Sequence, residues 1–449
     1  MTDTPTTAPS PERLAARAKE PDWSTWRTKV EAVGGCSAPI HLHGEFWIRS
    51  KETGDNLAGV EGRVFVPCGN RREAVCPACS EVYRQDAFHL IRSGISGGKT
   101  VPDTVATHPR LFVTLTAPSF GPVHTRVVHT TGKVLRCRCG ETHRGTDSRI
   151  GTAINPATYD YTAAVLWQAH SGELWHRFTI RLRRELARAA GIKVREFADH
   201  ARISYAKVAE YQQRGMVHFH SIIRLDGPSG PEDTPPAWAR PELLAAAVET
   251  AAAEVRINRT LPVAEGVERA FTFAWGTQID VRPVASGEQL ENADGAISDH
   301  ALAGYIAKYA TKGTDATDTA DRPFRTAEAI EHVRATEHHK HMMRETWRLG
   351  GLPRLRALRN WAHMLGFRGH FLTKSRRYSM QLEHLRNARR LHRYTTQLDA
   401  LGVTEDDITV INHWEHTGNG YSSPAEQELA EAIGRRQREN RKHRKEPEQ

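Results

Sequence analysis

The chain has few cysteines and no long apolar run. Six cysteines among 449 residues are too few for the disulfide framework of a secreted protein. No stretch approaches the roughly 20 apolar residues of a membrane-spanning helix. The Thr-, Pro- and Ala-rich segment 1–20 also lacks the apolar centre of a secretory signal. We therefore expect a cytoplasmic protein with no membrane partner.

Lysine is scarce as well. The chain has 13 lysines and 49 arginines, and 53 acidic residues leave a net charge of +9. A GC-rich coding sequence accounts for the larger part of this bias, but guanidinium groups are also the better ligands for phosphate oxygens. Residues 321–397 carry 17 basic and 6 acidic side chains, and seven more basic residues lie between 435 and 445. This charge favours a polyanionic partner.

The hydrophobic pattern divides the chain into segments of different character. Residues 110–116 form an apolar, β-branched run that predicts a buried strand. Residues 161–190 carry apolar side chains at helical spacing and predict a long helix. The Gly-, Thr- and His-rich segment 119–156 between them predicts an insert. Further predicted elements are a hairpin at 203–223, a helix at 241–256, a strand at 271–281 and a helix at 298–312.

Two histidines are predicted to share one face of a strand. In the His-Phe-His run at 218–220, alternation along the strand places both imidazoles on one side. A three-residue loop at 213–215, ending in glycine, makes Glu210 face His218 across the hairpin. A two-residue loop would shift the register and turn Glu210 away. With the longer loop, Glu210, His218 and His220 form a carboxylate and two imidazoles suited to Mg²⁺, Mn²⁺ or Zn²⁺.

Tyrosines and lysines recur on a predicted helix at 305–312. Positions four apart share a helix face, so Tyr305 and Tyr309 are expected to point the same way, with Lys308 and Lys312 beside them. Taken alone, this segment is more typical of an amphipathic helix with tyrosines packed on a sheet and lysines in solvent.

The order of three motifs changes this interpretation. A strand ending Thr-Leu-Thr at 114–116 is followed by the His-Phe-His strand and then by the Tyr-x-x-Lys-Tyr-x-x-Lys helix. This order resembles that of rolling-circle replication initiators of the HUH endonuclease superfamily. More narrowly, the chain resembles the initiators of actinobacterial plasmids and integrative elements, over roughly residues 34–313. Further stretches that look like this family are 68–72, 108–121, 173–175 and 218–226.

The resemblance implies a transesterification at phosphorus on single-stranded or cruciform origin DNA. A tyrosine hydroxyl attacks one phosphodiester, which leaves a 5′-phosphotyrosyl enzyme and a 3′-hydroxyl that primes synthesis. Mg²⁺ or Mn²⁺ on Glu210, His218 and His220 would polarise the scissile phosphate. Tyr309 matches the position of the nucleophile in initiators with one tyrosine, and Tyr305 the position at which relatives have a second tyrosine or a glutamate.

The resemblance also implies roles for the two lysines, and it implies which partners the protein has. Lys308 and Lys312 would steady phosphate charge, although either could be a solvated helix lysine. Beyond origin DNA, the expected partners are a host helicase and a polymerase.

Four cysteines make one plausible structural zinc site, formed by Cys36, Cys68, Cys76 and Cys79. The Cys-Pro-Ala-Cys knuckle has the two-residue gap of zinc sites and is the strongest part of the pattern. Cys36 is the weakest member. The residues that could replace it are His41, His43 and His89.

Two other histidine and cysteine groups are weaker. Cys137, Cys139 and His143 offer three donors, but relatives carry more cysteines here and a further Cys-x-x-Cys before the Tyr-Asp-Tyr segment at 159–161. We therefore expect no second zinc. The His-His-Lys-His run at 338–341 is expected at an exposed helix end.

These patterns, with the resemblance, predict an α+β fold. Its centre would be an HUH-type antiparallel sheet with helices, preceded by an N-terminal zinc-binding module and followed by a mainly helical basic region. The expected ranges are a disordered leader at 1–30, the zinc-binding module at 31–105, the HUH endonuclease domain at 106–315 with its insert at 119–156, a DNA-binding region at 316–430 and a basic tail at 431–449.

Two alternative functions stay open. One is a transposase or conjugative relaxase of the same superfamily, which is less favoured because many relaxases place the tyrosine before the histidine pair. The other is a sequence-specific DNA-binding regulator without catalysis. Origin cleavage favours the initiator, and tight origin binding without cleavage favours the regulator.

Overall fold

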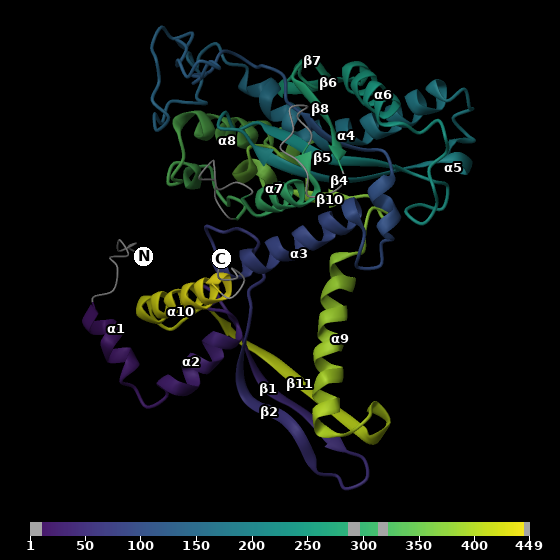
Figure 1. Cartoon of the computed structure of the whole chain (residues 1–449). Coiled ribbons are helices and arrows are strands. Elements are labelled where there is room, and N and C mark those ends of the chain that lie inside the picture. Colours follow the sequence, from purple (N-terminus) through teal and green to yellow (C-terminus); the bar gives the residue numbers. More distant parts are fainter. Residues whose placement is uncertain (1–10, 286–296, 313–321, 444–449) are drawn as a thin grey trace. The chain divides into compact units, whose positions relative to one another are not determined.

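The structure is a computed structural model that describes residues 11–285, 297–312 and 322–443 (Figure 1). The chain divides into two compact units, of which the first comprises residues 1–86 and 382–449 and the second residues 87–381. The first unit therefore combines both ends of the chain, whereas the second is continuous. The boundary falls within helix α3 (Pro77–Ser96).

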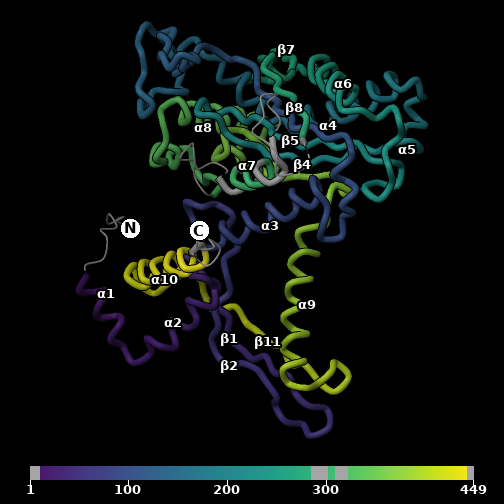
Figure 2. Tube along the Cα trace, viewed as in Figure 1, coloured from purple at the N-terminus to yellow at the C-terminus, as the bar shows by residue number. Residues whose placement is uncertain are grey.

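The first unit is built on a three-stranded antiparallel sheet in the order β11-β1-β2. Strands β1 and β2 and the distant β11 lie side by side in it (Figure 2). The elements of this unit besides the start of α3 are α1 (Pro11–Ala18), α2 (Trp23–Ala32), β1 (Ile40–Ser50), β2 (Asn56–Val66), α9 (Leu382–Leu401), the 3₁₀ turn η5 (Glu405–Asp407), β11 (Ile408–Asn419) and α10 (Pro424–His443).

Both terminal segments are more ordered than the sequence suggested. The sequence predicted a disordered leader at 1–30 and a basic tail at 431–449. In the described residues, α1 and α2 occupy most of 11–30, and α10 continues to His443. The reason is an apolar contact across the unit, in which Trp26 and Val30 of α2 are buried with Ala430 of α10. An amphipathic helix is stable when its apolar face finds such a partner, and local composition does not show whether it will.

The second unit contains a six-stranded sheet in the order β10-β4-β5-β3-β8-β9. Its strand pairs are antiparallel except for the β8–β9 pair, which is parallel. The sheet strands are β3 (Arg110–Leu115), β4 (Arg202–Tyr211), β5 (Val217–Asp226), β8 (Ile279–Ala285), β9 (Ile297–Ser298) and β10 (Leu372–Lys374). A separate two-stranded ribbon is formed by β6 (Ile257–Ala264) and β7 (Val267–Phe273).

The α-helices of the second unit are α4 (Tyr161–Ala189), α5 (Phe197–His200), α6 (Pro241–Glu254), α7 (Asp299–Lys312) and α8 (Glu337–Leu349). Its 3₁₀ helices are η1 (Asp103–Thr107), η3 (Glu328–Ile330) and η4 (Pro353–Met364). None of the helices in the described ranges is long and apolar enough to cross a bilayer.

Helices contact both faces of the central strands. On one face, Trp175 of α4 packs against Tyr205 of β4 and Phe219 of β5, with ring centroids 5.2 and 6.0 Å apart. On the other face, Tyr305 of α7 packs edge-on against Phe112 of β3, at 5.9 Å. The predicted α+β fold with antiparallel sheets is confirmed.

The region 316–430 differs from its expected organisation. Its residues are divided between the two units, and it contributes strands as well as helices. β10 pairs with β4 at the edge of the six-stranded sheet, and β11 pairs with β1. Each strand provides hydrogen-bond partners for backbone groups of a strand edge that would otherwise be exposed. Such pairing joins residues far apart in the chain, so no local sequence pattern predicts it.

Candidate active site and metal centres

The β4–β5 hairpin places a carboxylate opposite a histidine. Glu210 pairs with His218 across the ladder, as the three-residue loop predicts. Gly215 has φ of +71°, which glycine adopts at low cost. Gln168 of α4 fixes this loop from the core side, because its amide donates to the Gly215 carbonyl at 2.9 Å and accepts from the Val217 N–H at 2.9 Å.

Three side chains converge on this face of the sheet. Glu210 Oε2 lies 2.8 Å from His218 Nε2 and 3.0 Å from His220 Nε2. The donor atoms of the three residues lie within 4.8 Å of one another. One carboxylate and two imidazoles on a rigid hairpin fit a divalent cation with room for further ligands.

The electrostatics of the cluster favour the protonation state that a cation requires. Burial raises the pKa of Glu210, but hydrogen bonds from His218 and His220 outweigh burial, and the pKa falls below its ordinary value. Burial lowers the pKa of His220. An ionised carboxylate and a neutral imidazole are the forms that bind metal.

Strand β3 orients one of the histidines. Thr114 pairs with His220 across the β3–β5 ladder, and its Oγ1 lies 3.0 Å from His220 Nδ1. Phe112 stacks on the same imidazole with ring centroids 5.6 Å apart. The sequence identified the 110–116 run as a strand and as the first of three motifs, and it assigned Phe112 and Thr114 no role at the cluster. The alternation of Phe112 and Thr114 was the available signal, but the register with β5 was needed to interpret it.

Helix α7 brings Tyr305 to the cluster. The Tyr305 hydroxyl lies 3.4 Å from His220 Nε2, and the two rings meet edge-on at 5.3 Å. Tyr305 is 39% exposed, so a substrate can reach it. Lys308 is on the same helix and is exposed. Tyr309 and Lys312 belong to α7 by their backbone, but their side chains lie outside the described residues.

The four N-terminal thiols are also brought together. Cys36 Sγ lies 3.8 Å from Cys76 Sγ and 3.7 Å from Cys79 Sγ, and Cys68 Sγ lies 3.7 Å from Cys79 Sγ. Sulfurs around a tetrahedral zinc with Zn–S bonds of about 2.3 Å are about 3.8 Å apart. The thiol set therefore fits zinc, and it includes Cys36.

Backbone amides support these sulfurs. The Ser37 N–H donates to Cys76 Sγ at 3.4 Å, and the Cys68 N–H donates to Cys36 Sγ at 3.3 Å. Such bonds stabilise thiolates. Of the histidines considered as substitutes, His41 stacks on Phe65 at 4.6 Å instead of joining the thiols.

A third group of donors lies in the segment between β3 and α4. Cys137, Cys139 and His143 are close together, and His124 joins them as a fourth member. Sequence reasoning missed His124, which is 13 positions before Cys137. Its position depends on how the segment folds back, which spacing alone does not reveal.

Two histidines of the run at 338–341 are buried and not exposed as expected, whereas His341 is exposed. His338 and His339 are each 3% exposed, and burial lowers the pKa of His338 to about 4. Their Nε2 atoms lie 3.2 Å from the carbonyl oxygens of Arg214 and Gln213 respectively. α8 therefore supports the hairpin loop. These tertiary contacts bury His338 and His339 although the run is polar.

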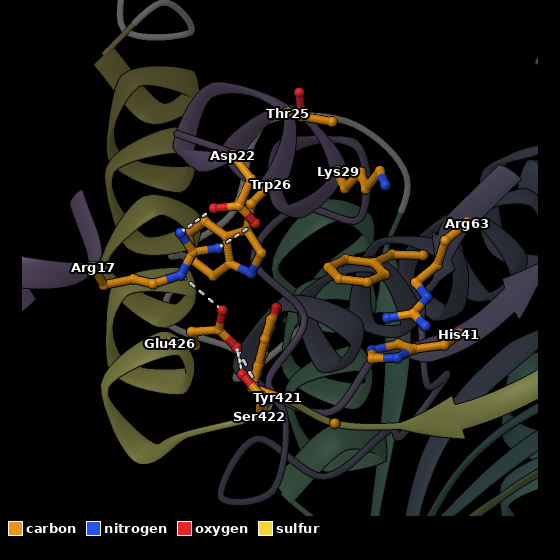
Figure 3. Close-up of a pocket in the computed structure, with 12 residues that line it drawn as sticks. Arg17, Asp22, Thr25, Trp26, Lys29, His41, Arg63, Tyr421, Ser422 and Glu426 are labelled. Atoms are coloured by element: carbon orange, nitrogen blue, oxygen red, sulfur yellow. Dashed lines mark hydrogen bonds and ion pairs between the residues drawn. The ribbon is translucent and has the colours of Figure 1, made fainter. Parts of the chain in front are cut away.

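The first unit also contains a cavity of about 310 Å³ (Figure 3). Arg17 lies along it and forms ion pairs with Glu426 at 2.8 Å and Asp22 at 2.7 Å. Because these carboxylates already compensate the guanidinium, we assign Arg17 the structural role of joining α1 to the start of α10.

Comparison with known proteins identifies the family of this chain. Residues 22–435 match the RepSA family, described as "Replication initiator protein, pSAM2". A protein of Streptomyces ambofaciens named "Replication initiator protein" is 45% identical over 436 residues, which cover 94% of this chain and 92% of that protein. No solved structure matches the chain. The chain therefore belongs to the RepSA family of replication initiator proteins.

Proposed function

We propose that this initiator nicks origin DNA by tyrosine transesterification and so starts rolling-circle replication. The observation that carries the proposal is the cluster of Glu210, His218 and His220 with the Tyr305 hydroxyl 3.4 Å from His220. A phenol beside a divalent-cation site is the combination needed to exchange one phosphodiester for another.

The hairpin residues have distinct tasks in this reaction. Glu210, His218 and His220 would hold Mg²⁺ or Mn²⁺, which when bound supplies charge neutralisation and Lewis-acid polarisation at the scissile phosphate. Glu210 contacts both imidazoles, and Thr114 orients His220 through Nδ1. Phosphoryl transfer depends mainly on such positioning.

A tyrosine of α7 would be the nucleophile. Its oxygen bonds to phosphorus, the bond from phosphorus to the 3′ oxygen breaks, and that oxygen leaves as a 3′-hydroxyl after taking a proton. Motif position assigns the first cut to Tyr309. Tyr305, one helical turn earlier, would make the second transfer or support the first, in agreement with its place beside His220. Lys308 and Lys312 would offset phosphate charge.

Origin DNA would be the first partner. A host helicase and a polymerase would then join, and the polymerase would extend the free 3′ end. Arg386 and Arg389 of α9 contact Asp86 of α3. Arg390 and Arg393 of α9 are exposed. Exposed arginines on one helix suit phosphate contacts. The four N-terminal cysteines would hold a structural Zn²⁺ in this unit.

The test is a covalent-adduct assay with a single-stranded origin oligonucleotide and Mn²⁺. Wild-type protein should give a protein–DNA band that survives denaturation. His218→Ala should lose the band and keep origin binding, because this half-buried side chain contacts Glu210 and His220 of the cluster. Tyr309→Phe should also lose it, whereas Tyr305→Phe should form the first adduct.

Tyr394→Phe on α9 is the matched control, since it removes a phenol hydroxyl far along the chain from the motif. An adduct mapped to Tyr305 alone would reverse the order of the tyrosines. Cleavage by the double Tyr305→Phe, Tyr309→Phe variant would rule out tyrosine chemistry. Tight binding with no cleavage by wild type would favour a regulator.

A further inference from the structure

The segment that joins β3 to α4 has little regular structure of its own. The described residues 116–160 contain no helix or strand, only turns and two isolated bridges, Val123–Ala153 and Val128–Val134. Val127, Val128 and Leu135 are large apolar side chains that remain exposed, by 51, 47 and 41%. A segment of this length with so few buried apolar groups needs another source of order.

Four metal-ligating side chains converge inside this segment. His143 Nε2 lies 3.2 Å from His124 Nδ1 and 3.3 Å from Cys139 Sγ. The donor atoms of these residues and Cys137 lie within 4.8 Å of one another. A tetrahedral zinc with Zn–N of about 2.0–2.1 Å and Zn–S of about 2.3 Å has edges of about 3.3–3.8 Å. The spacing of the four donors therefore fits one ion.

The surroundings are those of a built site. Cys137 and His143 are buried, at 5% and 2% exposed, and both cysteines are free thiols. The backbone N–H of Thr125 donates to Cys137 Sγ at 3.4 Å. A tight turn places the thiols, in which the Gly140 N–H donates to the Cys137 carbonyl and Gly140 has φ of +93°.

A carboxylate behind His143 completes the arrangement. His143 Nδ1 lies 2.8 Å from Asp147 Oδ2, so the proton sits on Nδ1 and the lone pair of Nε2 points toward the other three donors. A carboxylate in this position is the usual outer partner of a zinc-bound histidine. Asp147 is itself held by Arg149 at 2.9 Å.

We propose that His124, Cys137, Cys139 and His143 bind one structural Zn²⁺. Two thiolates and two imidazoles form the soft, tetrahedral donor set that selects zinc over Mg²⁺ or Mn²⁺. The two thiolate charges neutralise the ion, which suits a mostly buried site. The sequence predicted no second zinc because the further cysteines of the relatives are missing here. In the structure His124 supplies a fourth donor beside Cys137, Cys139 and His143.

The ion would also stabilise the hairpin loop. A side chain at Gly151 would collide with the backbone of Gln213, and Arg214 donates to the carbonyls of Ala117 and Pro118 at 2.7 and 2.9 Å. The segment therefore lies directly against the loop that sets the Glu210–His218 register. The zinc content can be measured without any nicking activity, so its test does not require an active enzyme.

The first test is the zinc content of the full chain after purification without chelator. The double variant Cys76→Ser, Cys79→Ser removes the N-terminal candidate site, and we expect it to retain one zinc per chain. Adding Cys137→Ser to that variant should remove this zinc. His129→Asn, which changes an exposed histidine of the same segment, is the matched control and should change nothing.

A second measurement covers the case in which Cys137→Ser does not fold. Cobalt substituted into the Cys76, Cys79 double variant should show the visible absorption of a tetrahedral site with two thiolates, and His124→Ala should weaken cobalt affinity at least tenfold. Absence of metal from the folded double variant would overturn the proposal. So would equal cobalt affinity with and without His124.

Discussion

The proposed metal cluster of Glu210, His218 and His220 can be tested through the hydrogen bond between Thr114 and His220. Thr114→Val replaces the hydroxyl with a methyl group of similar shape at a half-buried position. With a cation bound, the lone pair of His220 Nε2 would face the ion and the ring proton would be on Nδ1, which would donate it to Thr114 Oγ1, 3.0 Å away. The substitution removes that acceptor and little else.

The size of the effect follows from what still restrains the ring. Loss of an orienting partner commonly lowers metal affinity or activity by about 10–100-fold, which corresponds to about 1.4–2.7 kcal/mol. Phe112 remains stacked on His220, with centroids 5.6 Å apart, and limits rotation of the imidazole. We therefore expect the lower end, about a tenfold weaker apparent affinity for Mn²⁺.

The assay is a Mn²⁺ titration of adduct formation with the single-stranded origin oligonucleotide. Thr114→Val should shift the midpoint to about tenfold higher Mn²⁺ and approach the wild-type rate at saturation, because the ligands themselves are unchanged. Thr114→Ser keeps the hydroxyl and should remain near wild type. An unchanged midpoint in the valine variant, or an equal shift in the serine variant, would refute the reasoning.

Three further predictions concern stability and metal content. Cys76→Ser should lower the zinc content by one per chain, measured by elemental analysis, and an unchanged content would exclude the thiol site. Burial lowers the pKa of Lys207 from 10.5 to about 7. Between these two pH values the lysine is therefore protonated in the unfolded chain and neutral in the folded chain. The free energy of unfolding in urea should then rise from pH 7 to 9 by up to about 1.4 kcal/mol per pH unit. The rise is reduced by the Phe219 ring, whose centroid lies 3.8 Å from Lys207 Nζ, because this contact stabilises the protonated lysine in the folded chain. A slope that persists in Lys207→Met would assign it to other groups. Asp226→Ala should destabilise the chain to urea by about 3–5 kcal/mol, because it leaves the buried Arg224 guanidinium without its ion-pair partner at 2.5 Å; a loss below about 1 kcal/mol would show that this network contributes little.

The local features of the candidate active site could be predicted from the sequence. Strand alternation and loop length are properties of neighbouring residues, and they suffice to place Glu210 opposite His218. The recurrence of Tyr305 and Tyr309 on a helix has the same local origin, and the structure has both residues on α7. The cysteine knuckle is likewise visible in the chain, because its two-residue gap is a requirement of metal geometry.

Only the tertiary structure showed which distant residues meet these elements. Thr114 reaches His220 because β3 pairs with β5 in one particular register, and His124 joins Cys137 because the segment folds back on itself. β11 completes the first sheet by pairing Asn419 with Ile40. Such contacts depend on which exposed strand edges and apolar faces remain to be covered once the local elements have formed. That is a property of the whole chain, and no window of the sequence contains it.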